Sequence, residues 1–276
     1  MKTGQCGLLP NRDLCNQPHC TCNNNLYKYT GYDVIYSIPP SSTTTIMSTS
    51  IDKDTISSFV PALVVVDMQH DFVHGSLAVP GSKAIISTVN KVLSFPDFKL
   101  KVATQDYHPH NHISFASTHN KPTFSTVTIF HPEDILDKTK GIKQVLWPDH
   151  CVANTTGANF VEGLKTDSFD AVIHKGTHSH IESYSAFRDI WNKGETELPE
   201  LLSRKKVTDI FFVGLAGDYC VKYTAIDALD YGYKTWLVTD GIKSISEEET
   251  AYEELKKKGA HFVTSEELKH KLTSST

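Results

Sequence analysis

Residues 210–229 read IFFVGLAGDYCVKYTAIDAL. The apolar run IFFVG at 210–214 is typical of a strand that is buried on both faces. A turn of small residues follows, and residues 219–231 then place apolar side chains, from Val221 to Leu229, at helical spacing. A buried strand that passes through a short turn into a helix is the repeating unit of α/β folds with a parallel sheet.

Five further short apolar runs are spaced along the chain and favour the same kind of strand. They are ALVVV (62–66), KVAT (101–104), AVIH (171–174), TWLVT (235–239) and HFVT (261–264). Helical patterns fill two of the gaps between them, at 82–94 and 247–258. Because strands and helices alternate, we predict an α/β fold: a doubly wound, mostly parallel sheet of about six strands flanked by helices.

The composition excludes several classes of protein. The chain has 276 residues with 39% hydrophobic content, which suffices for a large globular core. A formal net charge of -5 leaves no basic surplus to neutralise phosphates, so nucleic acid is not expected as a partner. Neither an apolar run of roughly 18 residues nor a secretory signal is present in the sequence. We therefore expect a cytoplasmic protein that does not bind membranes; the sequence is compatible with a homo-oligomer.

The first part of the chain differs from the rest in composition. Residues 41–50 read SSTTTIMSTS, and four of the six cysteines lie within the first 22 residues. The spacing of these cysteines does not repeat the paired C-x-x-C pattern of zinc ribbons. We predict a low-complexity, disordered leader at 1–58 and a single folded domain at 59–276.

Chemically reactive side chains follow the predicted strands. Asp67 follows the first strand, Asp106 and His108 follow the second, Lys175 follows the third, and the strand at 210–214 leads through a turn to Cys220. Each of these residues alone has an ordinary structural explanation, as a cap, a solvated amine or a small core residue. Ligands bind beyond the carboxyl ends of parallel strands, however, and the four reactive types together indicate a site at that edge.

Cys220 is the best candidate for a nucleophile. It begins a helix, where free backbone N–H groups and the helix dipole favour the thiolate, and a cationic Lys175 acts in the same direction. Asp67 could take the thiol proton and deliver it to a leaving group. The N–H groups of Ala216 and Cys220 could form an oxyanion hole. These roles together imply acyl transfer through a thioester.

A metal site is predicted from the segment TQDYHPHNHISF at 104–115. Asp106 and His108 project to the same side of an extended backbone, and His150 in LWPDHC could supply a third ligand. Two imidazoles and a carboxylate suit a divalent metal, for which zinc is our first choice and iron or manganese are alternatives. His112 is the first candidate for a further ligand.

The chain resembles the nicotinamidases among the isochorismatase-like cysteine hydrolases. The resemblance extends collinearly over residues 61–265, about three quarters of the chain. The matching stretches are VVVDMQHDF (64–72), GSLAVPG (75–81), TQDYHPHNHISFA (104–116), LWPDHC (146–151), KGTHSHIESYSAF (175–187) and GLAGDYCVKYTAIDAL (214–229).

This resemblance implies a reaction and assigns residues to it. The family's catalytic triad falls on Asp67, Lys175 and Cys220, and its metal ligands fall on Asp106, His108 and His150. The implied reaction is the hydrolysis of nicotinamide to nicotinate and ammonia, a step in NAD salvage. The resemblance also implies a cis peptide bond between Leu215 and Ala216.

In the family, the metal binds the pyridine nitrogen of the substrate while aromatic rings hold its plane. Phe72 and Trp147 match those positions, with Tyr184 and Leu215 as further candidates for the substrate-binding surface. The chain departs from the family at Gly217, where many relatives have threonine. Two alternatives stay open: a related hydrolase of another small amide or ester, and a catalytically silent binding protein on the same fold.

Overall fold

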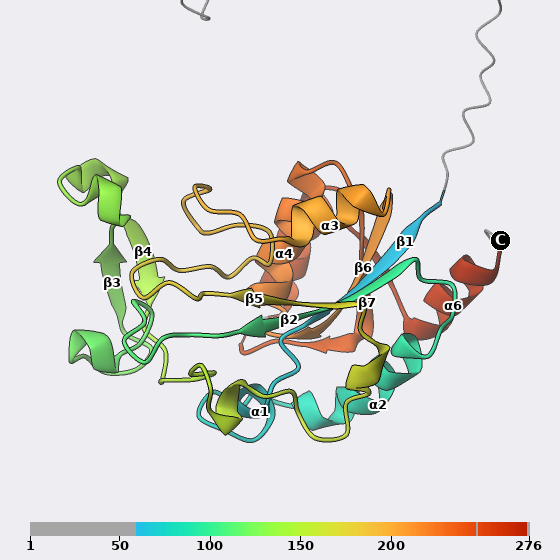
Figure 1. Cartoon of the computed structure of the whole chain (residues 1–276), viewed down its shortest axis with the longest axis horizontal. Helices are drawn as coiled ribbons and strands as arrows, with labels where there is room; N and C mark the ends of the chain where they lie inside the picture. Colours follow the sequence, from blue (N-terminus) through green and yellow to red (C-terminus); the bar gives the residue numbers. More distant parts are fainter. Residues whose placement is uncertain (1–58, 247, 275–276) are drawn as a thin grey trace, which may run out of the picture. The chain divides into compact units, whose positions relative to one another are not determined.

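The structure is a computed structural model that describes residues 59–274 apart from Glu247 (Figure 1). The predicted leader at 1–58 lies outside the described residues, so the proposed domain boundary stays a prediction. In the part that is described, none of the helices has both the length and the apolar character needed to cross a membrane.

The described chain alternates strands and helices as the sequence patterns predict. The strands are β1 (Pro61–Val66), β2 (Leu100–Asp106), β3 (Thr126–Ile129), β4 (Ile142–Val145), β5 (Ala171–Lys175), β6 (Asp209–Leu215), β7 (Lys234–Lys243) and β8 (His261–Val263). The helices are α1 (His70–Val73), α2 (Ser82–Leu93), α3 (Leu198–Arg204), α4 (Cys220–Asp230), α5 (Glu248–Lys257) and α6 (Ser265–Ser274). All six predicted strands and all three predicted helices are present.

The main sheet has the strand order β5-β2-β1-β6-β7-β8, and every pairing in it is parallel. The chain builds outward from β1 to β2 and β5, and then in the opposite direction from β6 to β7 and β8. The order of strands therefore reverses between β1 and β6, which is where ligands bind in doubly wound sheets. The predicted fold class is confirmed.

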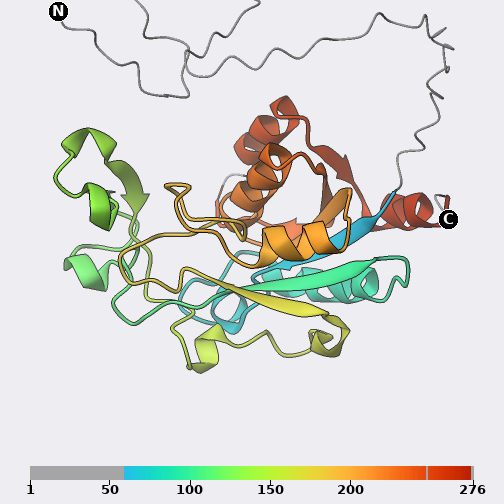
Figure 2. The same cartoon turned by 45° about the horizontal axis from the view of Figure 1, so that its top comes forward.

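Helices cover both faces of this sheet, as Figures 1 and 2 show. Alternate residues of β1 point to opposite faces: Leu63 and Val65 join one apolar cluster, whereas Ala62 and Val64 join the other. The first cluster includes the buried sides of α2 and α6, and the second includes those of α3, α4 and α5. Burial on both faces explains why the strands are continuously apolar.

The long connection between β2 and β5 carries an excursion that the sequence patterns did not predict. Strands β3 and β4 pair antiparallel in a separate two-stranded sheet, which projects from one side of the main sheet in Figure 1. The same connection contains five short 3₁₀ turns at Ser117–His119, Pro132–Asp134, Lys138–Lys140, Thr156–Ala158 and Thr166–Ser168. This excursion supplies part of the site described below.

The aromatic ring of Phe211 tests how much of the stability lies in the sheet core. The ring is fully buried on β6, stacks on Trp236 with centroids 5.5 Å apart and meets Phe98 edge-on at 5.9 Å. We expect Phe211→Ala to lower the free energy of unfolding by about 3–5 kcal/mol because it leaves a cavity. The control Val172→Ala, on β5 where 43% of the valine is exposed, should cost less than about 1 kcal/mol. Urea unfolding measures both, and equal losses would contradict this view of the core.

Candidate active site

The carboxyl ends of four neighbouring strands bring the predicted catalytic residues together. Asp67 directly follows β1, while Asp106 and Lys175 end β2 and β5 and lie opposite each other in register. Cys220 is the first residue of α4, beyond the turn that leaves β6. Parallel strands end at one edge, so residues up to 153 positions apart in sequence, Asp67 and Cys220, meet there.

The ammonium group of Lys175 is the centre of this cluster. Its side chain is inaccessible to solvent, and Nζ lies 3.0 Å from Asp67 Oδ2, 2.5 Å from Asp106 Oδ1 and 3.3 Å from Cys220 Sγ. Carboxylate oxygens of the two aspartates and the Cys220 sulfur all lie within 4.8 Å of one another. One buried cation therefore contacts the candidate base, the candidate nucleophile and a candidate metal ligand.

The pKa values of the two aspartates shift in opposite directions. Although burial opposes ionisation of both, the charge of Lys175 holds the pKa of Asp106 well below its ordinary value. Burial raises the pKa of Asp67, and Lys175 only partly offsets this. Asp67 Oδ1 accepts a hydrogen bond from the Thr104 hydroxyl at 2.6 Å, whereas Oδ2 receives no well-aligned hydrogen bond from the described residues. Asp67 is therefore the aspartate suited to accept and release a proton.

The protonation of Cys220 differs from the sequence-based expectation. Burial raises the pKa of its thiol well above the ordinary value, and Lys175 opposes this shift only in part. The sequence predicted that the helix N-terminus and Lys175 favour the thiolate, whereas in the structure the removal of water has the larger effect on the pKa and favours the thiol. A neighbouring base is then needed to take the thiol proton.

The turn between β6 and α4 keeps its peptide bonds trans. Among the described residues no peptide bond is cis, so the predicted cis bond between Leu215 and Ala216 is wrong. The chain reverses instead through a left-handed Ala216, with φ 57°. The hydrogen bonds of the turn use the N–H groups of Gly217, Tyr219 and Val221 as donors, rather than those of Ala216 and Cys220. The two N–H groups that were predicted to form an oxyanion hole are therefore not used by the hydrogen bonds of the turn.

Two features hold this turn in place. Gly217 packs so closely that a Cβ atom there would lie 2.5 Å from the Ser244 hydroxyl oxygen and 2.8 Å from an Ile242 methyl group. Ser244 and Ile242 therefore occupy the space that a threonine side chain would need at this position. The carboxylate of Asp218 accepts hydrogen bonds from the N–H groups of Ile245 and Ser246, both at 2.9 Å, and so ties the turn to the end of β7.

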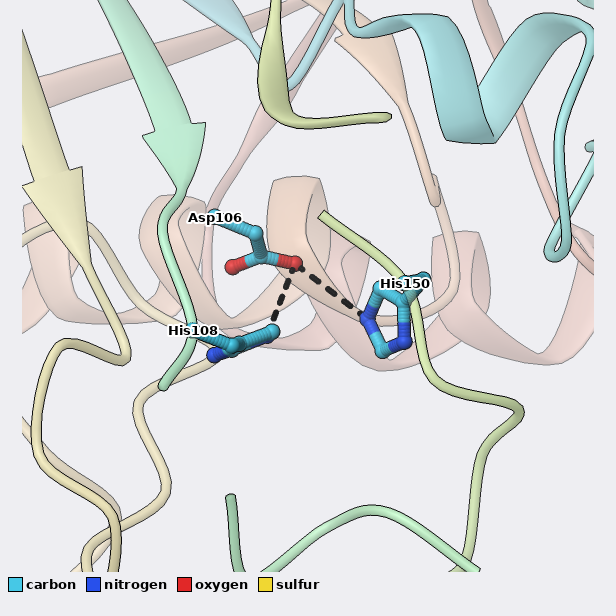
Figure 3. A group of neighbouring side chains, drawn as sticks. All are labelled: Asp106, His108 and His150. Atoms are coloured by element: carbon cyan, nitrogen blue, oxygen red, sulfur yellow. Dashed lines mark ion pairs between the residues drawn. The ribbon is translucent and has the colours of Figure 1, made fainter. Parts of the chain in front are cut away.

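The three predicted metal ligands converge in space, as Figure 3 shows. Asp106 Oδ2 lies 3.6 Å from His108 Nε2 and 3.7 Å from His150 Nε2. One ligand atom from each residue lies within 4.8 Å of the others, and all three side chains are buried. This arrangement is the donor set of a divalent transition metal with coordination positions left open.

Backbone carbonyls fix both histidine rings for this role. His108 Nδ1 lies 2.9 Å from the carbonyl oxygen of Gly176, and His150 Nδ1 lies 2.7 Å from that of Pro148. With Nδ1 donating to a carbonyl, Nε2 of each ring carries the lone pair that a metal needs. Gly176 is required here, since a Cβ atom would lie 2.5 Å from His108 Nδ1. The residues present fit a divalent metal.

His112 has a different environment. Its Nδ1 lies 2.7 Å from the Ser114 hydroxyl and its Nε2 lies 3.1 Å from the Ile181 carbonyl oxygen, so both ring nitrogens are occupied. The ring stacks on His108 with centroids 4.1 Å apart. His112 therefore supports the position of His108, and it is not a member of the three-residue ligand group.

A pocket joins the candidate nucleophile to the candidate metal ligands. It is lined by Phe72, Leu77, Asp106, His108, Trp147, His150, Glu182, Tyr184, Ala216, Cys220 and Ile245. Asp67 and Lys175 are fully buried and do not line it. Leu215, predicted on the substrate surface, lies instead in the apolar cluster of the sheet. A larger, more open cavity adjoins the pocket and shares Leu77, Trp147 and Ile245 with it.

The aromatic wall of the pocket is held by hydrogen bonds from the β3–β4 excursion. The Tyr184 hydroxyl accepts hydrogen bonds from the side-chain amide of Gln144 at 2.6 Å and from the indole N–H of Trp147 at 3.1 Å. The Tyr184 ring also stacks on Tyr223, with centroids 5.4 Å apart. Tyr184 and Gln144 thus fix the orientation of Trp147.

Sequence reasoning missed several residues that shape the site. Leu77, Glu182 and Ile245 line the pocket, and Gln144 and Asp218 position its walls. Glu182 carries a usable signal, since it is an acid in the loop directly after β5, at the same sheet edge as Lys175. Leu77 and Gln144 carry none, because their placement depends on how long loops pack.

A family comparison agrees with this geometry. The family model described as "Isochorismatase domain" matches residues 61–267, which include every member of the cluster and of the ligand group. The chain belongs to the isochorismatase family. The motif-based resemblance is confirmed, and the six-stranded sheet is the isochorismatase fold.

Nicotinamidases are among the relatives of this isochorismatase-family chain. The chain is 37% identical over 188 residues to the nicotinamidase of Escherichia coli, covering 67% of this chain and 84% of that protein. The structure of yeast nicotinamidase Pnc1p bound to the inhibitor nicotinaldehyde aligns with a TM-score of 0.68 at 35% identity, covering 74% of this chain and 100% of that one. The pyrazinamidase of Pyrococcus horikoshii in complex with zinc aligns with a TM-score of 0.57 at 37% identity, covering 74% and 98%.

The Tyr184 hydroxyl gives a direct test of the aromatic wall. We expect Tyr184→Phe to lower the free energy of unfolding by about 1–3 kcal/mol, because it removes the acceptor of the Trp147 indole N–H and one of the two acceptors of the Gln144 amide. The control Tyr223→Phe, on the neighbouring ring that is 38% exposed, should stay within about 0.5 kcal/mol of the parent. Urea unfolding compares the two. A Tyr184→Phe protein as stable as the control would show that these hydrogen bonds do not hold the wall.

Proposed function

We propose that this protein is a nicotinamidase, which hydrolyses nicotinamide to nicotinate and ammonia through a cysteine thioester, in NAD salvage. One observation carries the proposal: Cys220 and the ligand group of Asp106, His108 and His150 line the same pocket. The nicotinamidases among its relatives support the choice of substrate. A pocket lined by both a nucleophile and metal ligands suits a flat heterocycle that carries an amide.

The reaction begins with a proton transfer inside the buried cluster. Asp67, whose pKa is raised by burial, takes the proton of the Cys220 thiol. The resulting thiolate lies beside the Lys175 ammonium, at the 3.3 Å separation of Nζ and Sγ, which stabilises its charge. The sulfur then attacks the carboxamide carbon and forms a tetrahedral intermediate.

The remaining steps use the turn and the same aspartate. The N–H groups of Ala216 and Cys220 bind the oxyanion of the intermediate. Asp67 returns its proton to the amide nitrogen, so that ammonia leaves and a thioester remains on Cys220. Asp67 then takes one proton from water, whose oxygen attacks the thioester and releases nicotinic acid, which ionises to nicotinate by giving its proton to solvent. The proton on Asp67 passes back to the sulfur and restores the starting state.

Asp106, His108 and His150 would hold the metal. When bound, the metal supplies a Lewis-acid contact for the pyridine nitrogen, which sets the carboxamide against Cys220. Phe72 and Trp147 would hold the plane of the ring, as the resemblance implies. The zinc complex of the Pyrococcus horikoshii relative supports zinc as the metal. A cytosolic location suits a free thiol nucleophile, because that compartment keeps thiols reduced.

The first test is ammonia release from nicotinamide by the purified chain. We expect activity that a strong chelator removes and that added zinc restores, and we expect Cys220→Ala to abolish it. The matched control is Cys151→Ala, which removes the second buried free thiol of the described residues and should retain activity. Persistent ammonia release by Cys220→Ala would refute the thioester route.

The second test concerns the ring nitrogen. Benzamide has the shape of nicotinamide but lacks the pyridine nitrogen, so it cannot be oriented through the metal ligands. We expect its kcat/KM to be lower by about 100-fold or more, because a misplaced carboxamide no longer meets the sulfur in line. Steady-state assays with both amides measure this ratio. Equal turnover would favour the alternative of a less selective amide hydrolase.

A further inference from the structure

Glu182 is a buried carboxylate that the proposed mechanism does not use. It lies in the loop that follows β5, it is only 2% exposed, and it lines the pocket together with Asp106, His108 and His150. It does not belong to the group of ligand atoms within 4.8 Å of one another. Glu182 therefore lines the same pocket as the three ligands without belonging to the ligand set.

Its carboxylate lacks the cationic partner that the two aspartates of the cluster have. Asp67 and Asp106 both form ion pairs with Lys175. For Glu182, the one hydrogen bond to the carboxylate from a described residue comes from the adjacent Ser183 N–H at 2.7 Å, and none of the ion pairs of the described chain includes it. Burial accordingly raises the pKa of the Glu182 carboxyl, while His108 favours its charged form.

A buried carboxylate without a cation is costly, by several kcal/mol when it is ionised. Such a group persists in a fold at low cost when a ligand supplies the missing positive charge. In metal sites, polar and charged groups just beyond the ligands orient the ligands and tune the metal, and loss of such a group typically lowers metal affinity or activity 10–100-fold.

We propose that Glu182 is the second carboxylate of the metal site, a positioning residue that stabilises a bound divalent cation from across the pocket. It does so through its charge and by accepting hydrogen bonds from polar groups on the open coordination positions. The inference rests on the metal site of the proposed function, and it adds to that site a residue outside the three ligands.

The charge count of the site supports this role. Lys175 and a divalent cation bring three positive charges, and the carboxylates of Asp67, Asp106 and Glu182 bring three negative ones. The site is thus neutral with Cys220 as a thiol, and it stays neutral when the proton moves from the sulfur to Asp67. Without Glu182 the same site carries one uncompensated positive charge, which opposes binding of the dication.

The test is metal binding by the full chain, without turnover. Protein stripped with a chelator is titrated with zinc in competition with a chromophoric chelator of known affinity. We expect Glu182→Gln, which keeps the size and the acceptor for Ser183 but loses the charge, to bind zinc about 10–100-fold more weakly. Glu182→Asp, which keeps the charge on a shorter side chain, should lose less. Zinc should also raise the Tm of the parent more than that of Glu182→Gln.

The matched control is Glu197→Gln, which removes the same charge from an exposed position before α3. It should bind zinc as the parent does. If Glu182→Gln folds, by circular dichroism, and binds zinc within about twofold of the parent, the proposal is overturned. If it does not fold, Glu182→Ala, which also removes the charge, takes its place, and the same result overturns the proposal. Because binding is measured directly, this result is separate from the nicotinamide assay: a parent that binds zinc but releases no ammonia would refute the proposed function alone.

Discussion

The buried ammonium of Lys175 is the interaction on which the rest of the site depends. It lies against two carboxylates and a thiol in a volume from which water is excluded. Two aspartates this close would otherwise be too costly to ionise together. Because Lys175 pairs most closely with Asp106, that carboxylate stays charged for a metal, whereas Asp67 keeps a raised pKa and can exchange a proton.

The fold delivers these groups by ending parallel strands at one edge. Strands β1 and β6 are neighbours at the point where the strand order reverses, and each is followed by a residue in the left-handed region, Asp67 with φ 50° and Ala216 with φ 57°. Such conformations are uncommon outside glycine and concentrate at functional sites. The strained turns and the catalytic cluster therefore occupy the same crevice.

Much of this arrangement was predictable because it depends on local patterns. The six apolar runs became six parallel strands, since burial on both faces requires such runs. Because ligands bind beyond the carboxyl ends of parallel strands, the residues after these strands, Asp67, Asp106, Lys175 and Cys220, were predicted to meet at one edge of the sheet. Two other expectations did not hold: Leu215 does not line the pocket, and burial raises the pKa of Cys220. Both depend on neighbours that no local pattern specifies.

The sequence by itself determined the fold class, the family and the identity of the reactive side chains, because periodicity and residue chemistry are properties of the chain. Only the tertiary structure decided which groups touch. It placed β3 and β4 so that Gln144 and Tyr184 hold Trp147, and it brought Glu182 to the wall of the pocket that the metal ligands also line. The physical reason is that contacts between distant loops depend on how the whole core packs, whereas strands and helices depend mainly on their own residues.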